Sequence, residues 1–103
     1  MNRAHQNLVI LSWNVRGLGQ QEKFDVMRDA LVQAHPSILC LQETKLHSIT
    51  AQKCKAFLSQ SLDSFHLVPA SGSRGGILTA WSSSSFILHD FIERLLTLKI
   101  GMT

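Results

Sequence analysis

The segment Leu8-Val9-Ile10-Leu11-Ser12-Trp13-Asn14 is an apolar run that ends in polar residues. The segment Ile38-Leu39-Cys40-Leu41-Gln42-Glu43 repeats the same pattern. Both apolar runs are continuous rather than alternating, which is typical of strands covered on both faces of a sheet. They predict two buried strands, at 8–11 and 38–41, each followed by a polar side chain.

One helix-length segment joins these strands. Phe24, Met27, Leu31 and Ala34 recur at helical spacing. His35-Pro36 ends the pattern, because the residue before a proline is pushed out of the helical region. The order strand, helix, strand predicts a parallel crossover, so Asn14 and Glu43 are expected at the same edge of the sheet.

The rest of the chain contains further apolar segments. A second helix is expected over about 50–62, with its inner face formed by Cys54, Phe57, Leu58 and Leu62. Strands are expected at 65–69 and 77–81, on either side of a turn at 71–76. Two more strands are expected at 86–91 and 96–100, with 82–85 as a loop between strands. The whole chain, 1–103, is therefore expected to form one α/β unit.

Three motifs carry a resemblance to a known family. Asn14 lies in Trp13-Asn14-Val15-Arg16-Gly17, Glu43 lies in Leu41-Gln42-Glu43-Thr44-Lys45, and Gly75-Gly76-Ile77-Leu78-Thr79-Ala80-Trp81 follows. Together they resemble the opening of the endonuclease/exonuclease/phosphatase superfamily. More narrowly, they are similar to the endonuclease domain of plant non-LTR retrotransposons, which is associated with a reverse transcriptase. The similarity runs from about residue 7 to the end of the chain.

This resemblance implies hydrolysis of DNA phosphodiesters, with Mg²⁺ held chiefly by Glu43 and with Asn14 binding and orienting the metal and phosphate. A glutamate suits Mg²⁺, a hard ion that keeps several waters and binds through one or two carboxylates. Arg16 could contact a phosphate through its planar guanidinium. The residues alone are also consistent with a solvated Glu43 beside Lys45 and with Asn14 as a turn residue.

The resemblance also implies a four-layer α/β sandwich built from two similar halves, of which this chain can supply only the N-terminal half. Motifs of the form Gly-Asp-x-Asn and Ser-Asp-His are absent, and the sequence contains no tyrosine. We therefore expect a partial domain, a mixed sheet with helices on one face, that has little or no activity alone. Its uncovered sheet face would favour self-association or a covering partner.

Composition sets broader limits. A net charge of +3 is compatible with DNA as a partner, and 45% hydrophobic with 17% charged residues is typical of a globular protein. No apolar run approaches the roughly 20 residues that span a bilayer. The first residues do not resemble a secretory signal, so an intracellular location is expected, and the resemblance implies the nucleus. Cys40 and Cys54 are expected to be reduced core thiols.

Two other functions remain open. The chain could be a non-catalytic module that binds nucleic acid or protein, or a phosphatase of the same superfamily. His47 follows the second motif but is expected to be a surface residue. The Gly17-Leu18-Gly19 stretch is not a dinucleotide fingerprint, because Glu22 replaces the third glycine.

Overall fold

The computed structural model describes residues 8–19, 21–72, 74–84 and 86–101. The elements follow in the order β1 (Ile10–Asn14), α1 (Gln21–Ala34), β2 (Ile38–Gln42), α2 (Ala51–Phe57), β3 (Ser64–Val68), β4 (Ile77–Trp81) and α3 (Phe86–Gly101). The strands form one sheet in the order β1-β2-β4-β3, where β1 and β2 are parallel and the other pairs are antiparallel. The expected α/β class, the mixed sheet and the parallel crossover are confirmed.

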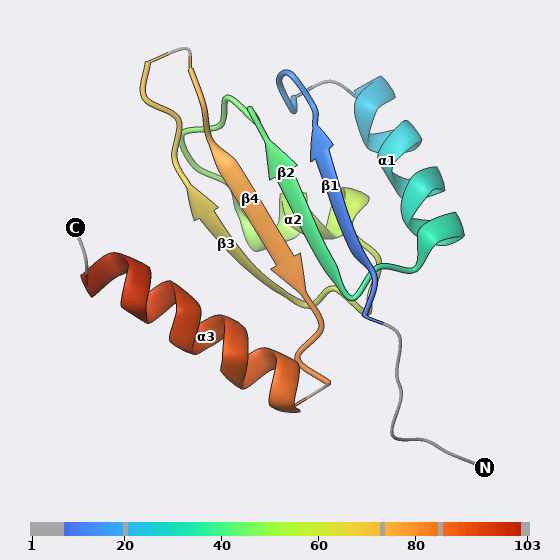
Figure 1. Ribbon diagram of the computed structural model, residues 1–103. Helices are drawn as coiled ribbons and strands as arrows, with labels where there is room; N and C mark the ends of the chain where they lie inside the picture. The colour runs from blue at the N-terminus through green and yellow to red at the C-terminus, as the bar shows by residue number, and fades with distance from the viewer. Residues whose placement is uncertain (1–7, 20, 73, 85, 102–103) are drawn as a thin grey trace.

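The hydrophobic core lies between one face of the sheet and two helices, α1 and α2 (Figure 1). Alternate residues of the central strands point to this face, because successive side chains of a strand point to opposite sides. The buried residues that these four elements contribute to this core are Leu39 and Leu41 of β2, Leu78 and Ala80 of β4, Met27 and Leu31 of α1, and Cys54 and Phe57 of α2. The rings of Phe24 and Phe57 stack with their centroids 5.1 Å apart, which joins the two helices.

Helix α1 ends as the sequence predicts. The amide of His35 still donates to the carbonyl of Leu31 at 2.9 Å, but His35 has a φ of 46° and the chain turns away before Pro36. A residue before proline avoids the helical region, which explains the stop.

Strand β1 differs from the prediction of a strand covered on both faces. Within the described part of the chain it is an edge strand that pairs with β2 alone, and Leu8, Val9 and Ile10 are all exposed. The Ile10 side chain is 59% exposed. Leu11 and Trp13 pack on the core, whereas Ile10 and Ser12 point to the open face of the sheet. The continuous apolar run therefore does not mean that both faces of this strand are covered.

Helix α2 is shorter than the expected 50–62. It begins after Thr50, whose hydroxyl accepts a hydrogen bond from the amide of Lys53, and it ends at Phe57. Leu58 is already extended, and the serines at 59 and 61 hydrogen-bond each other. Serine competes for local hydrogen bonds and weakens a helix interior, which explains why the helix is short. The four residues of the predicted inner face, at 54, 57, 58 and 62, are nevertheless all buried.

The two strands expected at 86–91 and 96–100 are wrong, because 86–101 forms the single helix α3. The alternation of Leu96, Leu98 and Ile100 suggested a strand, and the burial of those side chains lies outside the described residues. Residues with high helix propensity around Glu93 and Arg94 outweigh that alternation, and Arg94 pairs with Asp90 one turn earlier at 2.8 Å. The connection expected between two strands therefore lies between β4 and α3, and its residues 82–84 are described.

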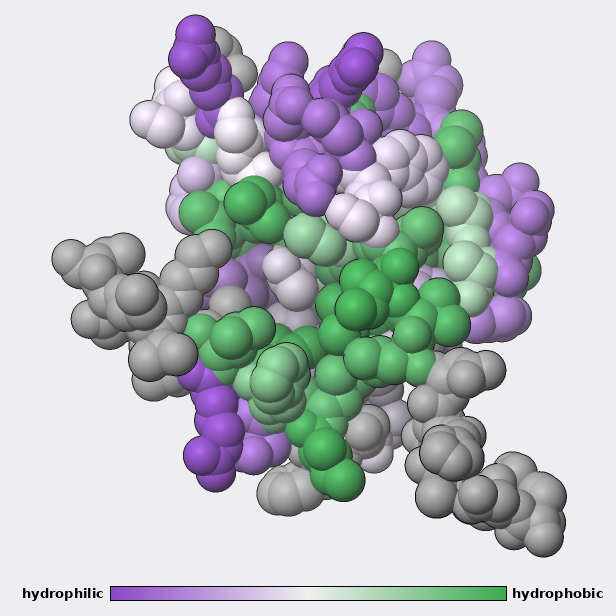
Figure 2. Space-filling view, viewed as in Figure 1, coloured by the Kyte–Doolittle hydropathy of each residue, from purple (hydrophilic) through white to green (hydrophobic). Residues whose placement is uncertain are grey.

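The second face of the sheet is open over much of its area. It carries Ile10, Ile38, Cys40, Ile77 and Thr79, in register across the strands. Helix α3 covers its end at Trp81, whose indole N–H donates to Nδ1 of His89 at 3.0 Å. Figure 2 shows hydrophobic side chains gathered on this side of the molecule, below a hydrophilic end.

Both cysteines are free. Cys54 is a core thiol as predicted, whereas Cys40 is only half-buried because it lies on the open face. Among the described residues, none of the helices has the length and apolarity needed to cross a bilayer.

Candidate metal and phosphate site

The ends of β1 and β2 bring Asn14 and Glu43 together. Asn14 lies opposite Gln42 in the parallel register, and Glu43 is the next residue of the chain. The side-chain amide of Asn14 donates to Oε2 of Glu43 at 2.6 Å. The sequence prediction that these two residues share one sheet edge is confirmed, while their chemical roles stay predictions.

The orientation of the Asn14 amide is set by the loop that follows it. The backbone N–H of Arg16 donates to Oδ1 of Asn14 at 3.2 Å. This bond holds the oxygen toward the loop, so the NH₂ group faces the carboxylate. The alternative interpretation of Asn14, a turn residue that binds nearby backbone, predicts this bond from Arg16. The same bond also orients Asn14 as the hydrogen-bond donor to the Glu43 carboxylate.

The loop after β2 places the Glu43 side chain outside the sheet. Glu43 and Lys45 have φ values of 53° and 60°, in the left-handed region that non-glycine residues seldom occupy. The carbonyl of Glu43 accepts from the N–H of Gly17 at 2.7 Å, and that of Thr44 accepts from Leu18 at 2.9 Å. These bonds join the loops after β1 and β2, and strain at such positions persists only where the surroundings determine the backbone.

Thr44 and Gly76 form a close contact beneath Glu43. Thr44 is buried, and its N–H donates to the carbonyl of Gly76 at 3.0 Å. A Cβ added to Gly76, which has a φ of 90°, would lie 2.5 Å from the Thr44 hydroxyl. Gly76 therefore permits a close backbone approach that a larger residue would block. Thr44 was not among the predicted site residues, although it lies inside the second motif.

A cationic hollow of about 390 Å³ lies beside the pair, between the loops after β1 and β2. Arg16, Lys45 and the two glycines at 17 and 19 are among its lining residues. The hydrophilic end of the molecule in Figure 2 corresponds to this loop-bearing edge in Figure 1. His47 is exposed, as predicted.

The side-chain oxygen atoms of Asn14 and Glu43 are suitable ligands for a hard, hydrated cation. The Asn14 bond uses one of the two oxygens of Glu43, whose side chain is exposed and leaves the other accessible. Across the described residues, no cluster of three or more His, Cys, Asp or Glu could enclose a metal. A single carboxylate with open positions suits Mg²⁺, which retains waters and takes further ligands from phosphate, better than it suits zinc.

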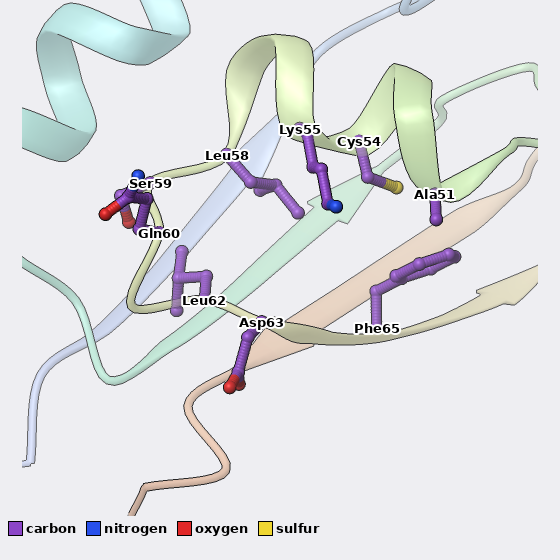
Figure 3. A pocket seen from close by; sticks show the side chains of 9 residues that line it. All are labelled: Ala51, Cys54, Lys55, Leu58, Ser59, Gln60, Leu62, Asp63 and Phe65. Carbon is purple, nitrogen blue, oxygen red and sulfur yellow. The ribbon is translucent and has the colours of Figure 1, made fainter.

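A separate pocket of about 420 Å³ lies between α2 and β3 (Figure 3). Its polar groups are poorly placed for catalysis. Burial raises the pKa of the Cys54 thiol to about 11, and both carboxylate oxygens of Asp63 accept hydrogen bonds from Ser83. The Asn14–Glu43 pair is therefore the stronger candidate site.

Comparison with known proteins assigns the family. The model of the endonuclease/exonuclease/phosphatase family matches residues 11–98, and the chain belongs to this family. No curated protein sequence matches the chain at a significant level.

Several solved structures share the fold. An AP endonuclease from Leishmania major is 25% identical, with a TM-score of 0.57 over 76% of this chain and 25% of its own. An AP endonuclease from Archaeoglobus fulgidus and the 3′ phosphatase NExo from Neisseria bound to a product DNA hairpin are each 23% identical, with TM-scores of 0.51 and 0.52. Each match covers 73% of this chain and 27% of the other. The chain thus spans about a quarter of the length of these structures.

Proposed function

We propose that this chain is part of one domain of a Mg²⁺-dependent DNA endonuclease, of the type found in plant non-LTR retrotransposons, with little or no activity alone. The observation that carries the proposal is the Asn14–Glu43 hydrogen bond at the ends of adjacent parallel strands. In open α/β sheets, that edge is where ligands bind. The family assignment and the three quoted motifs support the nuclease class.

In this proposal Glu43 would hold the ion and Asn14 would orient the Glu43 carboxylate. The oxygen of Asn14 already accepts the Arg16 N–H, but a carbonyl oxygen has two lone pairs and can also serve as an oxygen ligand. When bound, Mg²⁺ would supply Lewis-acid stabilisation of negative charge on a phosphate. The Arg16 guanidinium, which lines the cationic hollow, would bind phosphate oxygens.

The low activity that we propose follows from the small number of functional groups at the site. One carboxylate, one amide and one guanidinium can bind and orient a phosphate, but they include no group placed to activate water. His47 is exposed on the loop after β2, and Asp63 is held by Ser83 at the other end of the sheet.

Divalent-ion titration tests the metal role. Wild-type protein is expected to bind Mg²⁺ weakly, with chemical-shift changes centred on Glu43 and Asn14. Glu43→Ala should remove this binding, whereas Glu22→Ala, which deletes an exposed carboxylate on α1, should leave it unchanged. Equal Mg²⁺ binding by all three proteins would contradict the proposal.

Assays of supercoiled plasmid and of a phosphomonoester separate the functional alternatives. We expect neither substrate to be cleaved appreciably by the wild type or by Glu43→Ala. Mg²⁺-dependent nicking lost in Glu43→Ala would show a complete working site, and phosphate release alone would favour the phosphatase alternative. Salt-dependent DNA binding that survives Glu43→Ala would favour a non-catalytic binding module.

We propose DNA as the partner and an intracellular, nuclear location for the protein. Imaging of a fluorescent fusion tests the location.

Self-association through the open face of the sheet is the proposed state of the isolated chain. Exposed Ile10 and Val68 and half-buried Ile38 lie on that face, and contiguous apolar surface of this kind favours association.

A further inference from the structure

The ammonium group of Lys23 is held by three consecutive backbone carbonyls. Lys23 lies in the first turn of α1, and its Nζ donates to the carbonyls of Val15 at 2.9 Å, Arg16 at 3.0 Å and Gly17 at 2.8 Å. A lysine ammonium has three N–H donors, so these bonds use all of them. Lys23 was not among the site residues predicted from the sequence.

The carbonyls converge because of the backbone conformation after β1. Arg16 has a φ of 52° and Gly17 a φ of 98°, so two successive residues lie at positive φ. Such a bend turns neighbouring carbonyls toward one point, where their partial negative charges repel unless a cation or donor lies among them. The Lys23 ammonium provides both the positive charge and the donors.

The same loop holds the two residues of the candidate site. Its Arg16 N–H donates to Oδ1 of Asn14, and its Gly17 N–H donates to the carbonyl of Glu43. Arg16 and Gly17, whose N–H groups make these two bonds, are thus residues whose own carbonyls bind Lys23. Moving the loop would turn the Asn14 amide away from Oε2 of Glu43.

The position of Lys23 in the helix supports this function. A cation in the first turn of a helix opposes the helix dipole, which favours anions at that end. Lys53 is likewise the third residue of its helix, but its side chain is exposed, whereas Lys23 is half-buried. The three charge-assisted hydrogen bonds offset the unfavourable placement of Lys23.

We propose that Lys23 is a positioning residue that fixes the loop at 15–17 and thereby orients Asn14 toward Glu43. The inference rests on the proposed function of that pair as a divalent-ion and phosphate site. It also means that the Lys23 ammonium is fully used within the protein and does not contact phosphate, although it borders the cationic hollow.

Metal-free NMR spectra of Lys23→Met test the positioning directly, with Lys53→Met as the matched control. Methionine keeps the length and helix propensity of lysine but has no donor. Lys23→Met is expected to shift the side-chain NH₂ signals of Asn14 and to speed hydrogen exchange of the Gly17 and Leu18 amides. Lys53→Met should change neither, and unchanged signals in Lys23→Met would overturn the proposal.

Titration with Mn²⁺ then measures the consequence for ion binding. Loss of an orienting partner outside the ligand shell lowers metal affinity by about 10-fold to 100-fold, which is the loss expected for Lys23→Met. If the wild type fails to bind Mn²⁺ at Glu43, the proposed function fails, while the metal-free spectra still decide the positioning of Asn14 by Lys23.

A second substitution, Lys23→Gln, guards against a folding defect. Its amide can satisfy some of the carbonyls, so we expect smaller changes at Asn14 and Gly17 than in Lys23→Met. Global loss of spectral dispersion in both variants would overturn the proposal, because Lys23 would then be a residue of overall stability.

Discussion

The amide of Asn14 donates to the carboxylate of Glu43 at 2.6 Å, although the two residues are 29 positions apart in the chain. Asn14 is the last residue of β1, and Glu43 directly follows β2. Because these two strands are parallel neighbours, the register of the sheet brings the two residues together. The hydrogen bond fixes one carboxylate oxygen and leaves the other at an exposed edge beside a cationic hollow. This arrangement is the physical basis of the first prediction.

Replacing Asn14 with alanine should weaken divalent-ion binding without unfolding the chain. The carboxylate loses its orienting donor, and an outer-shell loss of this kind lowers metal affinity by about 10-fold to 100-fold. Calorimetric titration with Mn²⁺ measures the change, with the exposed Gln33→Ala on α1 as the control. Unchanged affinity in Asn14→Ala would show that Asn14 does not orient the carboxylate.

Gly76→Ala should destabilise the fold far more than Gly75→Ala. Both glycines have positive φ, so each alanine carries a backbone cost of about 1 to 2 kcal/mol. Only the Cβ at 76 would meet Thr44 and Lys45, at 2.5 and 3.1 Å, and we expect about 3 kcal/mol or more in total there. Urea denaturation measures both, and equal losses would disprove the close approach.

The contribution of Asp63 to stability should depend on pH. The backbone N–H and the hydroxyl of Ser83 donate to the Asp63 carboxylate at 2.8 and 2.7 Å and lower its pKa. A carboxyl with a depressed folded pKa stabilises the fold above its unfolded pKa, and that stabilisation is lost as pH falls through the folded pKa.

The Tm difference between wild type and Asp63→Ala should therefore be full at neutral pH and shrink below a pH of about 4. Thermal unfolding followed by circular dichroism across this range measures it. Asp29→Ala, which removes an exposed carboxylate of α1, is the control for the loss of a surface charge. A constant difference for Asp63→Ala at all pH values would contradict the Ser83 contact.

The two cysteines should differ in reactivity. Burial raises the pKa of Cys54 to about 11, which leaves roughly 100-fold less thiolate near pH 8 than an ordinary thiol has. Cys40 is half-buried on the open face and should react first with a thiol reagent. Rates measured on Cys40→Ser and Cys54→Ser separate the two, and fast labelling of Cys54 in folded protein would contradict its burial.

Self-association should depend on the open face of the sheet. Ile10 points to this face, whereas the equally exposed Val32 lies on α1. Ile10→Lys is expected to shift sedimentation toward monomer, because a charge cannot be buried cheaply in an apolar contact. Val32→Lys is the matched control, and the same sedimentation for both variants and the wild type would place any association elsewhere.

Much of the fold could be read from local pattern. The helix at 21–34, its stop before Pro36, and strands at 38–42, 64–68 and 77–81 follow from periodicity and turn residues that act over short stretches of chain. The edge shared by Asn14 and Glu43 also follows from sequence, because a strand, helix, strand unit aligns the ends of its strands. These features depend on residues close together in the chain.

Tertiary structure decided what depends on distant neighbours. The exposure of Ile10 follows from β1 being an edge strand, and no local pattern states which strands lie at an edge. Helix α3 formed where alternation suggested strands, and the hydrogen bond from Trp81 to His89 docks this helix on the open face, a contact that no local pattern predicts. The three carbonyls around Lys23 and the contact of Gly76 with Thr44 exist only once separate loops meet, since hydrogen bonding and steric fit act through space and not along the sequence.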